Sequence, residues 1–346
     1  MAIITKTIGT AVGRDYSTIA GWIAGQAGNF VTSDTIQKGV CYPDSVFNEV
    51  FTISGATVNS THYWWLTCSV KNNGIVNAGV VLDRLNATGT IAYLFDQYSI
   101  FDYMELRNIK TTNDNINYFV RFALNSVMDS LLIHGCSTGD TQRPCGIGTA
   151  NSSTTNASLV KNCMVYGFVN VWAARGIALG DAGLVEVYNN TVFNLENQAG
   201  GSSIGFEAGS RTNNIVKNNL ALTVETACFT GTWGTATNNE SSDATAPGTS
   251  AIINATAANE ITNTVSGSED LHLKSGAQAI NAGATIASFS ADISGNSRPQ
   301  GASWDIGADE FITTTSIKTI DGLVKASVKT VDGLAIASVK TRNGLE

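Results

Sequence analysis

A short pattern recurs through the middle of the chain and constrains its fold more than any other feature. In each copy an apolar pair and one variable residue precede an Asn or Asp, and a second apolar strand follows. The anchoring residues Asp129, Asn162, Asn189 and Asn218 are 33, 27 and 29 residues apart. One short strand cannot bury its apolar face until a copy of itself lies against it. A repeat of this length therefore predicts a solenoid of stacked coils.

The residues around the anchors indicate a solenoid made of strands. Thr, Val, Ile, Asn and Gly dominate, whereas long runs of Ala, Leu, Glu and Lys at helical spacing are missing, which disfavours helical repeats. Short apolar segments such as 131–133 follow the anchors and run into Gly135, Gly167 or Asn194, residue types that tolerate left-handed turns. We therefore predict an all-β fold, a parallel β-helix.

Asn at equivalent corners of successive coils predicts a ladder of side chains. Stacked amides hydrogen-bond to one another and so satisfy polar groups whose burial without a partner costs about 1–3 kcal/mol each. Asn108, 21 residues before Asp129, is interpreted as an earlier copy of the anchor. The predicted ladder comprises Asn108, Asp129, Asn162, Asn189 and Asn218. We favour this structural role for them over a catalytic one.

Composition and charge narrow the possible partners. Charged residues make up 14% of the 346 residues and hydrophobic residues 43%, which suits a large all-β core with an uncharged surface. The net charge of −8 disfavours nucleic-acid binding, which would need clustered Lys and Arg. No segment approaches the roughly 20 apolar residues of a membrane span, and the first residues lack the features of a secretory signal. We expect neither a nucleic acid nor a membrane as partner.

The cysteines and histidines indicate no cofactor and no metal. The six cysteines are spread widely without a CxxC pair, which disfavours a zinc site. Cys136 and Cys145 bracket one loop and would form a disulfide in an oxidising medium, but reduced and mostly buried thiols are the favoured alternative. The histidines, which have no partner at useful spacing, are His62, His134 and His272.

Residues 270–311 carry the most specific pattern in the chain. An apolar run ending in Asn-Ala-Gly is followed by Asp-x-x-Gly-x-x-Arg-Pro and then by Asp-Ile-Gly-Ala-x-Glu. This succession resembles the terminal coils of right-handed parallel β-helix proteins of the pectin-lyase-like superfamily. Gly276 and Ala277 stand where that family has Ser-Pro, and Asn281 stands where it has Asp. The resemblance implies a right-handed β-helix that ends in closing coils, and it implies no particular activity.

The chain is predicted to have three parts. Residues 1–45 hold an apolar strand and a short helix, capped by Asp15 or Ser17, that covers the first coil and protects its strand edges. Residues 46–311 form the β-helix body with its closing coils. Residues 312–346 form a tail of three eleven-residue repeats.

The tail is predicted to attach the protein to other chains. Each repeat places Asp-Gly or Asn-Gly between two strand-like runs, a strong turn signal. Three such units bury too little surface to fold alone, so they pair with a partner surface or, alternatively, form a flexible solvated tail. The repeats resemble those of phage structural proteins. The predicted attachment residues are Lys318, Asp321, Gly322, Lys329, Asp332, Gly333, Lys340, Asn343 and Gly344.

No catalytic pair of carboxylates is evident from the repeat alignment. Glycoside hydrolysis needs two carboxyl groups about 5–5.5 Å apart for retention or about 6.5–9.5 Å apart for inversion. Aligned on the anchors, Glu105 and Glu186 share one column three coils apart, about 14 Å at the strand spacing, which is too far. Asp181, Glu207 and Arg211 lie on insertions that the alignment does not place, and they are the fallback catalytic candidates.

Aromatic residues supply the remaining signal of function. Flat rings offer apolar area for stacking on sugars at little cost in ordering. Trp64 and Trp65 lie in one strand, where alternation sends one side chain inward and the other outward. Together with Trp172 beside Arg175 and Trp233 in a Gly- and Thr-rich loop, they form the predicted ligand-binding set. Packing in the core is the alternative.

These features together predict a phage virion structural protein, either a head decoration protein or fibre or a tail spike, with a glycan- or surface-binding role and no catalysis. We expect a homotrimer that joins other virion proteins through its tail, assembled in the host cytoplasm and extracellular after lysis. A polysaccharide-degrading tail spike, lyase or glycoside hydrolase, is the alternative function. A bacterial cell-surface adhesin is a third hypothesis.

Overall fold

The computed structural model divides the chain into two compact units, Met1–Phe311 and Ile312–Glu346. The residues that it describes are 1–110, 116–123, 125–137, 143–149, 157–180, 184–197, 200–209 and 212–312, with four two-residue strands in the second unit. Among these residues no helix is long and apolar enough to cross a membrane.

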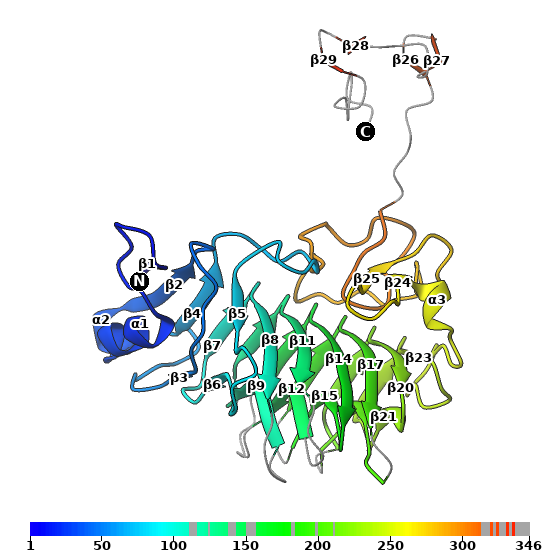
Figure 1. The fold of residues 1–346 in the computed structure, drawn as a ribbon, viewed down its shortest axis with the longest axis horizontal. Helices are drawn as coiled ribbons and strands as arrows, with labels where there is room; N and C mark the ends of the chain where they lie inside the picture. Colours follow the sequence, from blue (N-terminus) through cyan, green and yellow to red (C-terminus); the bar gives the residue numbers. More distant parts are fainter. Residues whose placement is uncertain are drawn as a thin grey trace. The chain divides into compact units, whose positions relative to one another are not determined.

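In the described part of the first unit, three parallel sheets run side by side (Figure 1). From Trp64 onward, successive strands of one coil enter sheet 1, sheet 2 and sheet 3 in turn, and the next coil repeats the order. The all-β parallel β-helix predicted from the sequence is therefore confirmed. Sheet 1 consists of β1 (Ala2–Ile8), β2 (Thr35–Cys41), β4 (Trp64–Cys68), β7 (Ser99–Asp102), β10 (Val127–Asp129), β13 (Ser158–Lys161), β16 (Val185–Tyr188), β19 (Ile215–Lys217) and β22 (Thr235–Thr237).

The other two sheets have seven strands each in the described residues. Sheet 2 consists of β5 (Val81–Asp83), β8 (Glu105–Lys110), β11 (Leu132–Ser137), β14 (Met164–Val171), β17 (Thr191–Asn197), β20 (Leu220–Val224) and β23 (Glu240–Ser241). Sheet 3 consists of β3 (Phe51–Ile53), β6 (Ala92–Leu94), β9 (Ile116–Phe122), β12 (Arg143–Thr149), β15 (Arg175–Ala178), β18 (Ile204–Glu207) and β21 (Ala227–Thr230).

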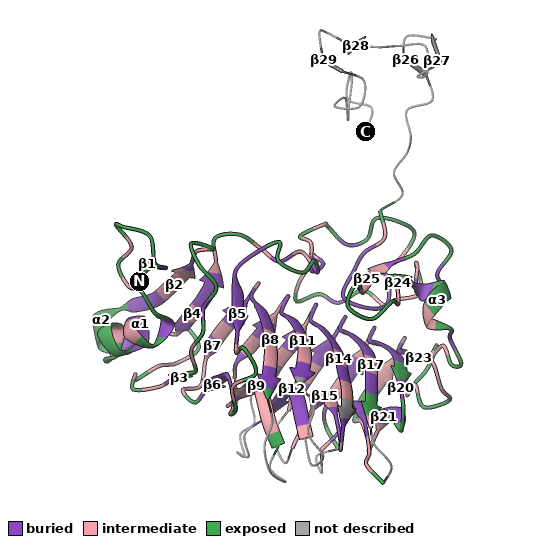
Figure 2. Cartoon of the chain, viewed as in Figure 1, coloured by how far each residue is buried: buried purple, intermediate pink, exposed green. Residues whose placement is uncertain are grey.

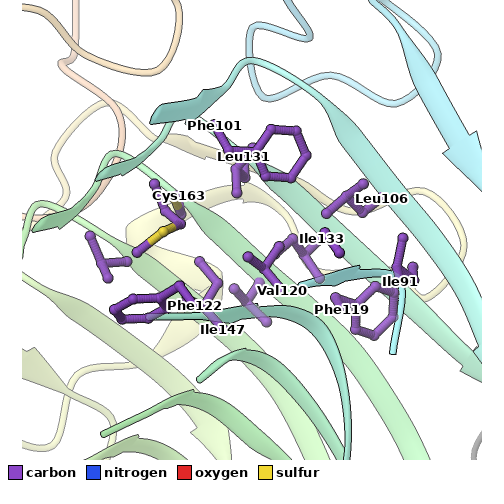
Figure 3. Packing of buried hydrophobic residues seen from close by; sticks show 14 of the residues in the cluster. Ile91, Phe101, Leu106, Phe119, Val120, Phe122, Leu131, Ile133, Ile147 and Cys163 are labelled. Carbon is purple, nitrogen blue, oxygen red and sulfur yellow. The ribbon is translucent and has the colours of Figure 1, made fainter. Parts of the chain in front are cut away.

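Aliphatic and aromatic side chains fill the space that the three sheets enclose. Figure 3 shows part of this core, where Ile133 of sheet 2 lies near Val120 and Ile147 of sheet 3. Aromatic rings also stack from coil to coil, and the ring centroids of Phe119 and Phe168 are 5.2 Å apart. Each such side chain contributes about 1.5–3 kcal/mol on burial, so the stacked coils stabilise one another.

The predicted N-terminal helix covers the first coils. Helix α1 (Ile19–Gln26) and helix α2 (Phe30–Ser33) bring Trp22 and Phe30 into edge contact with Trp64, with ring centroids 5.2 and 4.7 Å apart. The helix cap is Thr18, whose side chain accepts a hydrogen bond from the Gly21 N–H. The choice of Asp15 or Ser17 as cap was wrong.

The corner between sheets 1 and 2 holds most of the predicted ladder. Asn162, Asn189 and Asn218 all adopt left-handed backbone angles there, and Asn218 Nδ2 donates to Asn189 Oδ1 over 3.1 Å. Asp129 lies one position earlier, opposite Lys161, and its carboxylate accepts a hydrogen bond from Asn162. Asn108 lies at a different place, inside a strand of sheet 2. Its assignment to this ladder was wrong, because β8 belongs to another sheet than the anchors.

A second ladder, directly after the anchors, was missed from the sequence. Asn190, Asn219 and Asn239 have no exposed surface, and their amides link coil to coil. Asn190 Nδ2 donates to Asn219 Oδ1 over 2.9 Å, and Asn219 Nδ2 donates to Asn239 Oδ1 over 3.2 Å. The signal was present as Asn-Asn doublets, in which the first Asn takes the left-handed turn and the second Asn points inward.

The C-terminal part of the first unit does not continue the stack. After a partial coil that pairs Glu240 with Ile252, the chain forms helix α3 (Ala257–Glu260) and an antiparallel pair, β24 (Ile261–Asn263) and β25 (Asp270–Leu273). This segment packs on the outer face of sheet 2, so the predicted closing coils were wrong (Figure 2). The segment packs there because the outer face of sheet 2 carries apolar side chains that would otherwise be exposed to water. These residues are Leu132, Met164, Phe193, Leu220 and Leu222.

A buried arginine holds this cover together. Arg298 and Glu310 form an ion pair without exposed side-chain surface, with Nη1 2.9 Å from Oε2. The second guanidinium nitrogen donates to the carbonyl oxygens of Gly307 and Ala308. The Arg-Pro motif and the Asp-Ile-Gly-Ala-x-Glu motif are therefore joined to each other by the contacts of Arg298.

The remaining predictions concern the thiols and the tail. Cys145 is a free, fully buried thiol whose pKa is raised by burial, so no disulfide joins it to Cys136. In the second unit β26 (Thr319–Ile320) pairs antiparallel with β27 (Leu323–Val324), and β28 (Thr330–Val331) pairs with β29 (Leu334–Ala335). The nine predicted attachment residues lie outside the described residues.

Candidate functional site

The outer face of sheet 3 carries a groove. Strand pairing sets Tyr93, Arg121, Gly148, Ala178 and Glu207 in one row across neighbouring coils. The small residues in the middle of the row leave a depression of about 350 Å³ between the larger side chains. The alternation of the strands, which sends the neighbouring residues into the core, therefore also builds this surface.

Tyr118 and Arg121 form one wall of the groove, and Tyr93 contacts Arg121 beside it. The guanidinium carbon of Arg121 lies 5.2 Å from the ring centroid of Tyr93 and 5.4 Å from that of Tyr118. The Tyr118 ring crosses the neighbouring strand at Gly148, where an added Cβ would come within 2.3 Å of Tyr118 Cε1. Burial, together with the nearby Cys145 thiol, raises the pKa of Tyr118. The phenol is therefore a neutral hydrogen-bonding group at neutral pH.

An ion pair forms the opposite side. Arg175 Nε donates to Glu207 Oε2 over 2.7 Å, and Arg175 Nη1 donates to the carbonyl oxygens of Ala174 and Ser202. The Glu207 side chain is 35% exposed, so solvent screening keeps the pair worth about 1 kcal/mol or less. The contact mainly orients the guanidinium, because the backbone carbonyls hold its other edge.

A smaller pocket of about 180 Å³ adjoins the groove. Trp172, Arg143 and Arg175 line it, and Ile116 lines both depressions. The Trp172 ring rests against Gly200, where an added Cβ would lie 3.2 Å from Trp172 Cη2. The predicted neighbours Trp172 and Arg175 therefore do meet at one site.

The charge of this surface is opposite to that of the protein. Among the described residues that line the two depressions there are three arginines, Arg121, Arg143 and Arg175, and a single carboxylate, Glu207. The whole chain carries a formal charge of −8. A local excess of Arg in a concave site attracts anions, and its forked donors suit carboxylate or sulfate groups.

The other predicted aromatic residues lie elsewhere. Trp64 is fully buried and donates from Nε1 to Asp96, so its assignment to a binding surface was wrong. Trp65 points outward on sheet 1, where Nε1 donates to Asp102 and the Lys38 ammonium lies 3.7 Å from the ring centroid. Trp233 packs against the end of the main core. The four tryptophans do not form one platform.

The fallback catalytic candidates are only partly placed. Glu207 lies in the groove, whereas Asp181 and Arg211 lie outside the described residues. The prediction that Glu105 and Glu186 share one column of the coils was wrong. Glu105 pairs with Leu132 in sheet 2, whereas Glu186 pairs with Leu159 in sheet 1. In the parts of the chain that the structure describes, no group of three or more His, Cys, Asp or Glu residues is arranged to hold a metal ion.

Sequence reasoning missed Tyr118, Arg121 and Arg143. The repeat was anchored on the corner between sheets 1 and 2, and insertions of unequal length separate that corner from sheet 3. Their signal is weak, since it consists only of polar and aromatic residues at outward positions of short strands.

No family model matches the sequence, and no curated protein matches it. A solved structure described as "Crystal structure of pectate lyase Pel9A" is similar to this chain, with 12% sequence identity and a TM-score of 0.30. The similarity covers 89% of this chain and 97% of that one.

Proposed function

We propose that the protein binds an acidic polysaccharide in the groove of sheet 3. The observation that carries the proposal is that three arginines and a single carboxylate line the two adjoining depressions, beside the ring of Tyr118. Guanidinium groups bind carboxylates through two parallel hydrogen bonds, and aromatic rings supply contact area for sugar rings. A chain of uronate or sulfated sugars offers both chemistries.

Binding without cleavage is the better supported form of this function. Glu207 is held by Arg175, and the described lining residues offer no second carboxyl group to complete an acid pair. A polysaccharide-degrading enzyme stays the alternative, with Glu207 as its candidate residue.

A matched pair of glycans tests the proposal. Pure full-length protein is titrated with polygalacturonate and with its methyl ester, which has the same backbone without the charge. We expect the acidic form to bind about tenfold more tightly or better, and Arg175→Ala to remove that preference. Arg84→Ala, which removes an equal charge outside the groove, is the control. Equal affinity for both glycans, or no binding, would overturn the proposal.

The same incubation separates binding from catalysis. We expect the length of the polysaccharide to stay constant over many hours. Shortened products that disappear in Glu207→Gln would establish the enzyme alternative in place of simple binding.

The predicted virion role is a separate proposal, and it rests on the repeats of the tail. A head decoration protein, fibre or tail spike would be present in purified phage particles at fixed stoichiometry, and the chain would sediment as a trimer. Mass spectrometry of particles tests this directly. Absence from particles would favour the adhesin hypothesis.

A further inference from the structure

A cleft of about 370 Å³ opens over sheet 2 and shares no lining residue with the groove of sheet 3. Its walls include Ile75 and Val76 on one side and the segment 267–270 on the other. Strand pairing places His134 of β11 beside Tyr166 of β14. Their rings stack with centroids 5.0 Å apart and an angle of 7°, and they form the floor of the cleft.

A buried carboxylate fixes the orientation of His134. His134 Nε2 lies 3.0 Å from Oε1 of Glu105, whose side chain has no exposed surface. Burial alone would raise the pKa of Glu105, but hydrogen bonds from His134 and from the Asn77 N–H outweigh it and lower that pKa. An ionised carboxylate only accepts hydrogen bonds, so Nε2 carries the proton. His134 Nδ1 makes no hydrogen bond among the described residues, so the contact with Glu105 fixes the orientation of the ring.

A charged histidine joins the two walls. His272 Nδ1 is 2.6 Å from Asp270 Oδ1, and His272 Nε2 is 3.0 Å from the carbonyl oxygen of Asn73. Burial alone would lower the pKa of His272, but Asp270 and Asp309 raise it to about 9, so His272 is protonated at neutral pH. Gly74, at a φ of +73°, lets the loop approach the His272 ring. The cleft is therefore held open by fixed contacts.

The charges in and behind the cleft are predominantly negative. Arg107 is shared between Glu105 and Asp83, and His272 offsets Asp270. Glu269 has no ion pair among the described residues. Burial first, and then the nearby carboxylates of Glu269, Glu105 and Asp270, raise the pKa of Tyr166, and the Arg107 guanidinium offsets part of this effect. The charged groups are four carboxylates and two cations: Asp83, Glu105, Glu269, Asp270, Arg107 and His272.

We propose that this cleft binds a small molecule that carries a primary ammonium group on an apolar skeleton. The ammonium has three N–H donors and no acceptor. It matches the Glu269 carboxylate, which lines the cleft beside the stacked rings of His134 and Tyr166 and only accepts hydrogen bonds when ionised. Ile75 and Val76, both solvent-exposed in the free protein, cover the carbon skeleton. The negative field stabilises the positive charge.

Cyclohexylamine and cyclohexanol test the proposal as a pair with the same ring and different charge. Binding to the full chain is followed at pH 7 by calorimetry and by the NMR signals of His134 and Tyr166. We expect the amine to bind about tenfold more tightly than the alcohol, with the signals of both rings shifting.

Two variants distinguish amine binding in the cleft from a general effect of the protein's negative charge. Glu269→Gln should weaken amine binding by about fivefold or more, whereas Glu186→Gln, the same change on sheet 1, should leave it unchanged. Equal affinity for amine and alcohol, no binding of either, or an unaffected Glu269→Gln variant would each overturn the proposal. None of these results bears on the polysaccharide groove, because the two sites share no residue.

Discussion

The groove of sheet 3 and the cleft of sheet 2 are built in different ways. The groove is made by side chains of neighbouring coils alone, so strand register sets its geometry. The cleft needs a second wall, which residues 267–270 of the C-terminal cover supply. The groove gathers arginines and the cleft gathers carboxylates. One β-helix thus carries two concave surfaces of opposite charge, and one of them depends on a segment outside the coils.

Arg298→Ala should separate the two sites most strongly. It removes the cation of a buried ion pair and leaves Glu310 unpaired, so we expect a loss of about 3–5 kcal/mol in the free energy of unfolding of the C-terminal cover. Amine binding in the cleft should disappear while polysaccharide binding in the groove persists. Limited proteolysis and calorimetry measure both effects.

Arg84→Ala is the matched control, because Arg84 donates a side-chain hydrogen bond to Asn48 at the exposed surface and has no ion pair among the described residues. Loss of both binding activities in Arg298→Ala would contradict the view that the coils alone build the groove.

Glu240→Gln should change how stability depends on pH. Glu240 has no exposed surface, and burial followed by the nearby charge of Glu260 raises its pKa to about 9. The folded protein therefore holds a proton that the unfolded chain releases above about pH 4.5, so stability falls as pH rises from about 5 to about 9. Gln cannot ionise. The variant should be more stable by about 3 kcal/mol at pH 7 and equal to the parent at pH 4.

Thermal unfolding between pH 4 and pH 9 measures this dependence. Glu186→Gln, at a half-exposed position of β16, should leave the curve unchanged. Parallel curves for Glu240→Gln and the parent protein would contradict the buried, protonated state of Glu240. Since Glu260 belongs to the C-terminal cover, the cleft should be the first site lost at high pH.

Gly148→Ala should damage the groove and spare the cleft. The added methyl group would clash with the Tyr118 ring, and such overpacking costs about 1–3 kcal/mol. We expect polysaccharide affinity to fall about fivefold as the aromatic wall moves. Gly28→Ala is the control, since an added Cβ there meets no atom within 4 Å. An unchanged affinity would remove Tyr118 from the proposed surface.

The fold could be predicted because equivalent positions of the repeat require particular residue types. Left-handed corners select Asn or Gly, and the Asn162, Asn189 and Asn218 anchors recur for that reason. Asn108 misled the alignment because it meets the same backbone requirement inside sheet 2. A single-residue signal of this kind identifies a turn without saying which corner of the coil it belongs to.

The sites could be predicted only in part, because both depend on contacts between distant segments. Trp172 and Arg175 are near in sequence and were found. Glu105 and His134 are 29 residues apart and meet only when β8 and β11 are in register. The placement of residues 270–311 against sheet 2 could not be predicted either. A motif indicates which residues contact each other, but it does not indicate which face of the protein they cover.

Salt should weaken ligand binding at the two sites unequally, with the smaller effect on amine binding in the cleft. Charges in the groove are partly exposed to solvent, and the Debye length falls from about 10 Å at 0.1 M salt to about 3 Å at 1 M. We expect polysaccharide affinity to fall about fivefold over this range and amine affinity about twofold, because the walls of the cleft keep counterions from the buried Glu105. Calorimetric titrations at both salt concentrations measure the two slopes, with cyclohexanol as the uncharged reference. Equal dependence of the two affinities on salt would mean that the cleft is as open to ions as the groove. Closure by the C-terminal cover would then make no electrostatic difference between the two sites.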